Sequence, residues 1–591
     1  MILNVLVILT IALVGYIWSV RGFFNALLHL MSVIAAGAIA FGLWETAAYA
    51  ILSNTTSQFA IDAAWAVGLA VPFTVSVAVL STLFTTVVRA NIIVSDGANY
   101  AGGGVCGAIA GFITAGVLAI SLSHLRGGSE TFGAQPITYE RASGALVRTS
   151  PLWVPADRIV AGLYSRLSAT TFRSGTPMAV YMPNPADRGF LTRLGPAGML
   201  LKNNIRPDDA VVIGRYTVGS DQAPLPAQAL LADTFDPGVI QKSADITGTP
   251  PTGNFKIEGV VLGTKAGLRE KVGQVAFGRG HVQLIVRDAD GSSTAVQPIA
   301  AVSQAQGDRK MSGRWRYDAS DVYISSVGGA ADPPFGFEFL VPPGSTPLAV
   351  VVRNIRLSLF DDAKEQPIPV FAQYASAAER DDAVRSGSLF AGTGGGTLDR
   401  SNARAFTGAP DGGGGNAEFQ VSNRLTKRLV KGQAPGLELS DTNLVVSGET
   451  RLRPSDLAQQ GVERTLLVER LSVDASTVVV QVDVSPTTQF SLLSPESQTG
   501  DGPPALIDES GQRFQAIGFI YEDATEHHLR YTAGSPIASI NDLPSMSRSR
   551  TDQKLTLLFR PSLGVKLKSY AVGSKVIRDF RPSVALDSPQ K

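Results

Sequence analysis

The chain has 591 residues, which is long enough for several domains. Its 51 Lys and Arg residues balance 50 Asp and Glu residues, so no overall charge favours nucleic acid or another polyanion as a partner. The single cysteine, Cys106, excludes disulfides within the chain and metal clusters built on thiolates.

Charged residues are sparse in the first 125 positions, where they are limited to Arg21, Glu45, Asp62, Arg89 and Asp96. The uncharged apolar runs between them are Ile2–Val20, Phe23–Trp44, Ala63–Val88 and Ala101–Leu122. Each run has about 19 residues or more, enough to cross about 30 Å of hydrocarbon as a helix. We therefore predict four transmembrane helices, followed from Arg126 by a region of ordinary soluble composition.

The loops between these runs differ in charge. Arg21 and Arg89 follow the first and third runs, whereas the loop after the second run offers only Glu45 and Asp62. Because positively charged loops stay in the cytoplasm, both termini and the long carboxyl-terminal region are expected outside the cytoplasm. Arginines soon after the fourth run oppose this orientation, but long domains are translocated largely regardless of such charges. The predicted location is the inner membrane.

The fourth run contains the stretch YAGGGVCGAIAGFITAG, in which Gly102, Gly104 and Gly107 match the dinucleotide pattern G-x-G-x-x-G. That site needs a preceding strand and an acidic residue about 20 positions later, and neither is present, so no cofactor is predicted. Gly103, Gly107 and Gly111 are instead spaced by four, which places them on one face of a helix. They predict a seam for close helix packing, and a homo-oligomer could form through it.

A first apolar run leading into VRGFF, with the turn Arg21-Gly22-Phe23, and a glycine ladder in the fourth run together resemble the colicin V production protein (CvpA) family. The resemblance covers about residues 2–125. It implies a multi-pass inner-membrane protein associated with toxin biosynthesis or export and with homeostasis of the cell envelope. No established catalytic chemistry accompanies it.

The chain departs from that family pattern where relatives often carry ionisable side chains. The corresponding positions here are Asn4, Ala26, Asn99, Tyr100 and Ala110. Ionisable groups inside membrane helices usually mark ion or proton pathways, so their absence weakens a transport function for this chain.

Residues 126–219 form a predicted membrane-proximal region that contains an amphipathic helix at about 151–170. Val160, Leu163 and Leu167 recur there at helical intervals, with Asp157 and Arg166 elsewhere on the helix. Two placements are open: along the membrane surface beneath the four helices, or against the following domain.

Short alternating strands dominate the rest of the chain and predict two antiparallel β-sandwiches, at 255–362 and 419–582. A linker at 220–254 precedes the first, a Gly-rich linker or long loop at 363–418 separates the two, and 583–591 forms a tail. The fold class is therefore multi-domain α+β, a four-helix transmembrane module followed by a mainly-β soluble region.

Motifs for catalysis or metal binding are few. Glu526, His527 and His528 could hold a divalent ion, but adjacent histidines on a strand face opposite ways, and a solvated loop is the simpler interpretation. The sequence contains neither a G-D-S-G nor a G-x-S-x-G nucleophile setting.

We therefore predict a protein that is not an enzyme and has no cofactor. Its partners are expected to be the lipid bilayer and an envelope protein or polymer, with no nucleic acid. Two other classes stay open: a component of an oligomeric channel or exporter, and a membrane-anchored hydrolase.

Overall fold

The structure is a computed structural model of the full chain. It describes residues 2–88, 95–128, 130–140, 144–171, 176–195, 200–227, 230, 252–270, 273–304, 312–317, 323–326, 334–361, 366–386, 389, 398–407, 418–474, 477–500, 502–509, 511–550 and 552–586.

Four long apolar helices open the chain, in agreement with the four predicted runs. They are α1 (Ile2–Arg21), α2 (Phe23–Asn54), α3 (Gln58–Val87) and α4 (Asp96–Ser123). All four are long and apolar enough to cross a membrane. Helices α2 and α3 extend beyond their apolar runs, because Ala48 and Leu52 of α2 and Ile61 of α3 are buried against the rest of the chain.

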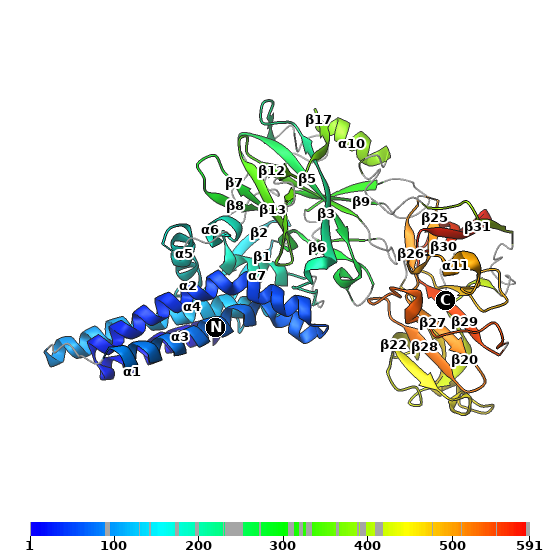
Figure 1. The fold of residues 1–591 in the computed structure, drawn as a ribbon, viewed down its shortest axis with the longest axis horizontal. Helices are drawn as coiled ribbons and strands as arrows, with labels where there is room; N and C mark the ends of the chain where they lie inside the picture. The colour runs from blue at the N-terminus through cyan, green and yellow to red at the C-terminus, as the bar shows by residue number, and fades with distance from the viewer. Residues whose placement is uncertain are drawn as a thin grey trace.

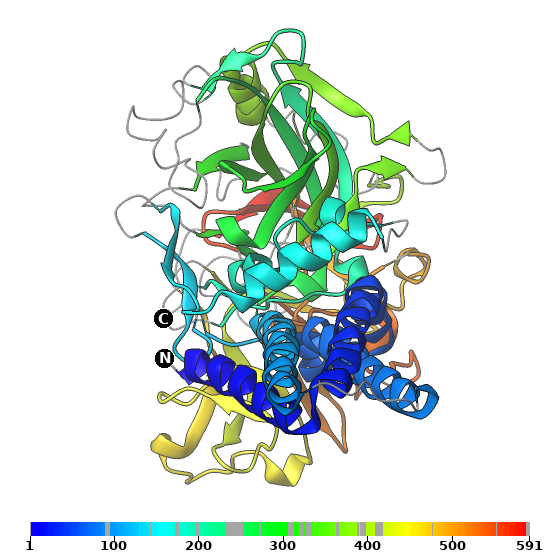
Figure 2. The same cartoon turned by 90° about the vertical axis from the view of Figure 1, so that its left-hand side faces the viewer.

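A short membrane-proximal region follows, made of β1 (Gln135–Tyr139), β2 (Leu146–Ser150), α5 (Ala156–Ala169), α6 (Met178–Tyr181) and α7 (Pro185–Arg193). The predicted amphipathic helix is α5, which begins after Pro155. It crosses the helical module: Val160 lies against Gly116 of α4, and Tyr164 lies against Gly37 of α2. Figure 2, which looks along the bundle, shows α5 lying across it. Helix α5 is thus docked on α2 and α4.

The first β-rich domain contains two main sheets. One has the order β10-β9-β12-β5-β3-β17, with β4 beside β5, and the other has the order β14-β13-β7-β8. Phe337 and Phe339 of β12 and Val350 of β13 belong to one core cluster, which joins the two sheets. The strands of the first sheet are β3 (Ala210–Val218), β4 (Leu225–Pro226), β5 (Asn254–Thr264), β9 (Ala300–Gln304), β10 (Ser312–Arg316), β12 (Phe335–Val341) and β17 (Val370–Tyr374). Those of the second are β7 (Val282–Arg287), β8 (Ser293–Val296), β13 (Thr346–Val352) and β14 (Ile355–Ser358). Two short pairs complete the domain, β6 (Ala276–Gly278) with β11 (Tyr323–Ser325) and β15 (Phe360–Asp361) with β16 (Gln366–Pro367).

The predicted boundaries of this domain are too narrow. Strand β3, placed by the sequence in the membrane-proximal region, pairs antiparallel with β5. Strand β17 and helix α10 (Ala377–Ser386), placed in the Gly-rich linker, also belong to the domain: β17 pairs parallel with β3, and Val384 packs in a cluster with Tyr216. Parts of the two predicted linkers, including 231–251, 390–397 and 408–417, lie outside the described residues.

The second β-rich domain also has two main sheets, one with the order β18-β31-β30-β25-β26 and one with the order β19-β24-β29-β27-β28-β22-β23-β20, with β21 beside β22. The strands of the first are β18 (Arg404–Phe406), β25 (Pro504–Asp508), β26 (Arg513–Gln515), β30 (Lys566–Val572) and β31 (Lys575–Ala585). Those of the second are β19 (Phe419–Val421), β20 (Arg424–Val430), β21 (Leu437–Leu439), β22 (Leu444–Leu452), β23 (Leu467–Leu471), β24 (Val480–Asp483), β27 (Gly518–Glu522), β28 (His527–Tyr531) and β29 (Lys554–Phe559). Helix α11 (Pro495–Gln498) lies beside β31. Strand β31 extends into the predicted tail, of which 587–591 are outside the described residues.

The three parts follow one another in space as they do in sequence. Figure 1 shows the helices projecting to one side, the first β-rich domain over one end of them, and the second domain on the far side of the first. Because α1 runs antiparallel to α4, the amino terminus lies toward the same end of the bundle as the end of α4. The Arg21-Gly22 turn lies at the opposite end, away from the β-rich domains.

Candidate functional site at the helix junction

The predicted glycine seam faces α1 of the same chain. A Cβ atom at Gly103 would lie 2.7 Å from the carbonyl oxygen of Trp18, and one at Gly107 would lie 2.7 Å from Cβ of Trp18. At Gly111 the nearest atom would be Cβ of Val14, at 3.0 Å. The seam is therefore occupied within one chain, and a homo-oligomer through it would have to displace α1.

The turn that carries the family resemblance is fixed by α4. Gly22 has φ of 89°, a conformation that favours glycine. The backbone N–H of Phe23 donates a hydrogen bond to Oδ1 of Asn99 at 2.8 Å. Asn99, one of the positions that departs from the family pattern, thus holds the Arg21-Gly22-Phe23 turn against the start of the glycine helix.

The weak metal candidates do not form a site. His527 and His528 lie on strand β28 and are buried, so the interpretation as a solvated loop is wrong for them. Nε2 of His528 lies 2.7 Å from Glu449, whereas His527 has Glu522 at 3.7 Å, and Glu526 is near Arg451. Among the described residues, no group of three or more His, Cys, Asp or Glu side chains is placed to hold a metal.

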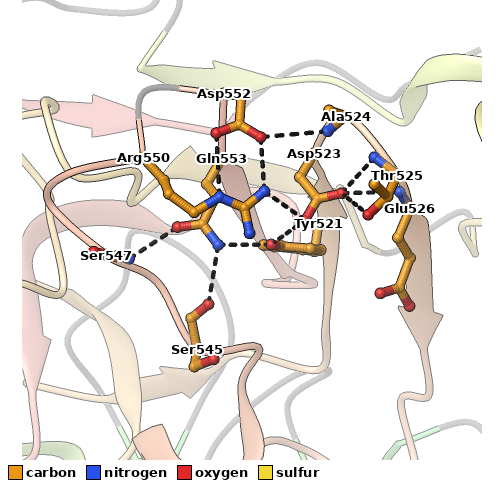
Figure 3. A network of polar contacts seen from close by, with 10 residues as sticks. All are labelled: Tyr521, Asp523, Ala524, Thr525, Glu526, Ser545, Ser547, Arg550, Asp552 and Gln553. Carbon is orange, nitrogen blue, oxygen red and sulfur yellow. Dashed lines mark hydrogen bonds and ion pairs between the residues drawn. The ribbon is translucent and has the colours of Figure 1, made fainter.

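The turn before β28 is held by a polar network (Figure 3). Arg550 contacts Asp552 at 2.7 Å and Asp523 at 3.1 Å, and the Tyr521 hydroxyl donates to Asp523 at 2.8 Å. Backbone N–H donors from Thr525 and Glu526 also reach Asp523, and these hydrogen bonds hold the pKa of that carboxyl well below its usual range. The acidic cluster therefore fastens a turn, with its carboxylates already engaged by the protein.

The junction between the helices and the first β-rich domain is polar and partly buried. The Asn204 amide donates to the backbone oxygens of Ile61 and Asp62 at 3.2 and 3.0 Å. It accepts a hydrogen bond from the amide of Asn354 at 2.9 Å. Asp62 also pairs with Arg126 at 3.0 Å. The amide contacts fix the domain on the start of α3, and the ion pair joins α3 to the segment that follows α4.

A second set of contacts joins the domain to α2. Arg356 of β14 pairs through Nε with Glu45 at 2.8 Å, and its backbone N–H donates to the Tyr49 hydroxyl at 2.9 Å. The Tyr49 hydroxyl donates in return to the backbone oxygen of Arg356 at 3.2 Å. The Arg356 guanidinium also lies 4.6 Å from the ring centroid of Tyr181.

These contacts border a cavity of about 770 Å³ between the end of α2, helices α6 and α7, and strands β3 and β14. This volume is within the range of pockets that bind small ligands. Its lining includes the apolar residues Phe41, Trp44 and Met178 and the charged residues Glu45 and Arg356. The cavity therefore lies where α2 passes from its apolar run to its first charged residue.

Arg188 of α7 is the unusual residue in the lining. It is 4% exposed, and its Nε and Nη2 atoms are buried without a hydrogen-bond partner among the described residues. Burial lowers the pKa of Arg188 to about 10, an effect that nearby Glu45 opposes. The guanidinium is therefore charged at neutral pH, although the protein supplies no ion pair within the described part of the chain.

Sequence reasoning did not find this cavity. Arg188 lies in PADRGF, which reads as an ordinary surface turn of a helix, and nothing local predicts that all of α7 is buried. The one sequence signal for this site was Glu45, which with Asp62 is one of only two charged residues between the second and third apolar runs. Its partner Arg356 is more than 300 residues away in the chain.

The chain was compared with protein-family models, curated proteins and solved structures, and none of them matched it.

Proposed function

We propose that the chain is a multi-pass inner-membrane protein of the CvpA type, without catalytic activity, that holds two β-rich domains outside the cytoplasm. The domains would bind an envelope protein or polymer. The helices would anchor them and set their orientation relative to the membrane.

The observation that carries this proposal is the junction. The first β-rich domain is held to α3 by the buried amides of Asn204 and Asn354, and to α2 by the Glu45–Arg356 ion pair. A fixed contact of this kind suits a protein that must present a binding surface at a set height above the membrane. A flexible tether would need none of these contacts.

The orientation is supported by the position of Arg21. It lies in the turn at the end of the bundle remote from the β-rich domains, and positively charged turns stay in the cytoplasm. The domains at the other end would then lie outside.

Reporter fusions test this orientation. Enzymatic reporters that are active only outside the cytoplasm, fused after Arg126 and after Lys591, should both be active. A reporter that is active only in the cytoplasm, placed in the loop after α1, should be active as well. Activity of the cytoplasmic reporter at Arg126 and Lys591 would refute the proposed placement. The channel alternative predicts solute flux through liposomes that contain the purified protein, which the anchoring function does not.

A further inference from the structure

The junction cavity carries an uncompensated positive charge. Among the described residues that line it, those with a charge are Arg188, Arg356 and Glu45, and their net charge is +1. Glu45 is engaged by Arg356 at 2.8 Å, so it does not neutralise Arg188 as a close partner. A buried guanidinium without an ion pair is costly, and an anion in the cavity beside Arg188 would lower that cost.

The cavity also has an apolar continuation. A narrow space of about 30 Å³ borders Phe41, Gly42 and Met178, which also line the main cavity, and runs between α2 and α5 beside Tyr164 and Leu167. A Cβ atom at Gly42 would meet nothing within 4 Å, so the absence of a side chain there keeps this passage open.

The two helices that border this space also carry exposed apolar side chains. Leu43 of α2 is 49% exposed, and Ile159 and Leu163 of α5 are 54% and 37% exposed. Helix α5 lies across the bundle at this level, as an interfacial helix would. A ligand in the cavity can therefore place a polar end beside Arg188 and the start of an apolar chain beside Tyr164 and Leu167.

We propose that the junction cavity binds one membrane lipid with a singly charged anionic headgroup. Arg188 holds the headgroup oxygens, and the passage at Gly42 receives the first part of an acyl chain. This inference rests on the proposed placement of the four helices in a membrane. It adds a specific lipid as a component of the junction between the helices and the first β-rich domain.

Native mass spectrometry of the full chain in detergent tests the proposal, with phosphatidylglycerol as the anionic probe and phosphatidylcholine as the zwitterionic one. The wild type should retain one phosphatidylglycerol and bind it at least about tenfold more tightly than phosphatidylcholine, as expected for charge-assisted hydrogen bonds. Arg188→Met should weaken phosphatidylglycerol binding about tenfold. Gly42→Leu should reduce binding of both lipids, because its side chain would fill the passage.

Two control variants separate the site from general effects. Arg166→Met removes an exposed charge of α5 at the same level, and Gly162→Leu adds the same side chain at a helical glycine that also has open space around it. Both should bind phosphatidylglycerol as the wild type does. In lipid-free detergent, Arg188→Met should melt no lower than the wild type, because it removes an unpaired buried charge; this shows that its loss of binding is not a loss of folding.

Equal phosphatidylglycerol binding by wild type and Arg188→Met would overturn the proposal. Displacement of the lipid by inorganic phosphate at comparable concentration would also overturn it, since the site would then recognise a free anion. The reporter fusions address a separate question: a reversed orientation would refute the proposed function and leave a measured lipid site intact.

Discussion

Two buried charged residues, Glu338 and Arg188, differ in the polar partners that the fold supplies to their charges. Glu338 of β12 is fully buried, and it accepts hydrogen bonds from Arg314 at 2.7 Å, from Arg380 at 2.7 and 2.8 Å, and from the Tyr216 hydroxyl at 3.0 Å. Arg188 is almost as buried and has no such set. The first arrangement satisfies its charge within the fold and is structural. The second leaves a charge for a ligand to satisfy.

Glu338 should make the stability of the first β-rich domain depend on pH. Burial alone would raise the pKa of Glu338, but Arg314 and Arg380 outweigh that effect and hold it at about 2. In the unfolded chain the pKa is about 4.3, so the ionised carboxylate stabilises the fold above that pH. The contribution is lost as the pH falls toward 2. Thermal unfolding followed by calorimetry should show the decline across this range.

Glu338→Gln isolates that contribution. It removes the carboxylate that Arg314 and Arg380 share, which should cost about 3–5 kcal/mol at pH 7. The variant should also lose stability less steeply than the wild type below pH 4. Glu438→Gln, at an exposed position on β21, is the control and should match the wild type. A Glu338→Gln melting temperature equal to that of the wild type would show that the network contributes nothing to stability.

At the scale of elements, the contact between α1 and α4 depends on small residues. Without side chains at Gly103, Gly107 and Gly111, the backbone of α4 approaches Trp18, Val14 and Ile11 of α1 closely. Lipid tails are as apolar as the helix surfaces, so van der Waals packing of this kind holds membrane helices together.

Gly107→Ala tests the seam with the smallest possible change. The added methyl group would lie 2.7 Å from Cβ of Trp18 and 2.9 Å from the carbonyl oxygen of Val14, so the helices must move apart. We expect a loss of about 1–3 kcal/mol, as for other overpacked sites. Gly104→Ala is matched in chemistry and lies on the same helix, but its methyl group would meet only Cβ of Ser19 at 3.5 Å. It should be neutral or gain up to about 1 kcal/mol from helix propensity. Equal melting temperatures for the two variants in detergent would argue against a seam at Gly107.

The elements that could be predicted are those with a local signal. The four apolar runs predicted four helices because charged residues bound each run, and Pro155 marked the start of α5. The second and third helices are longer than predicted because the burial of Leu52 in α2 and of Ile61 in α3 extends them beyond their apolar runs. Strand β3 was missed because its partners β5 and β17 lie far along the chain, and no local pattern links them. Arg188 was missed for the same reason: its burial comes from packing between distant segments.

At the scale of the whole molecule, one short segment joins the four helices to the first β-rich domain. Residues 203–206 lie across the ends of three helices: Asn203 donates to the backbone oxygen of His124, Asn204 to those of Ile61 and Asp62, and Arg206 to that of Thr55. The same segment receives the Arg353–Asn354 turn between β13 and β14, in which both residues have positive φ. Motion of the β-rich domain relative to the helices would break these contacts together.

Asn204→Ala should loosen this junction without unfolding the distant domain. It removes an acceptor for the buried Asn354 amide and the donor to two backbone oxygens, a loss of about 1–3 kcal/mol. Hydrogen exchange should rise in residues 200–206, at the start of α3 and in β14, and stay unchanged in β27–β29 of the second domain. Asn541→Ala, at an exposed position in the second domain, is the control and should leave exchange at the junction as in the wild type. Unchanged exchange in Asn204→Ala would mean that the Asn204 contacts do not hold the junction. The set height of the β-rich domains above the membrane would then depend on apolar packing and on the contacts of Arg356 with Glu45 and Tyr49 of α2.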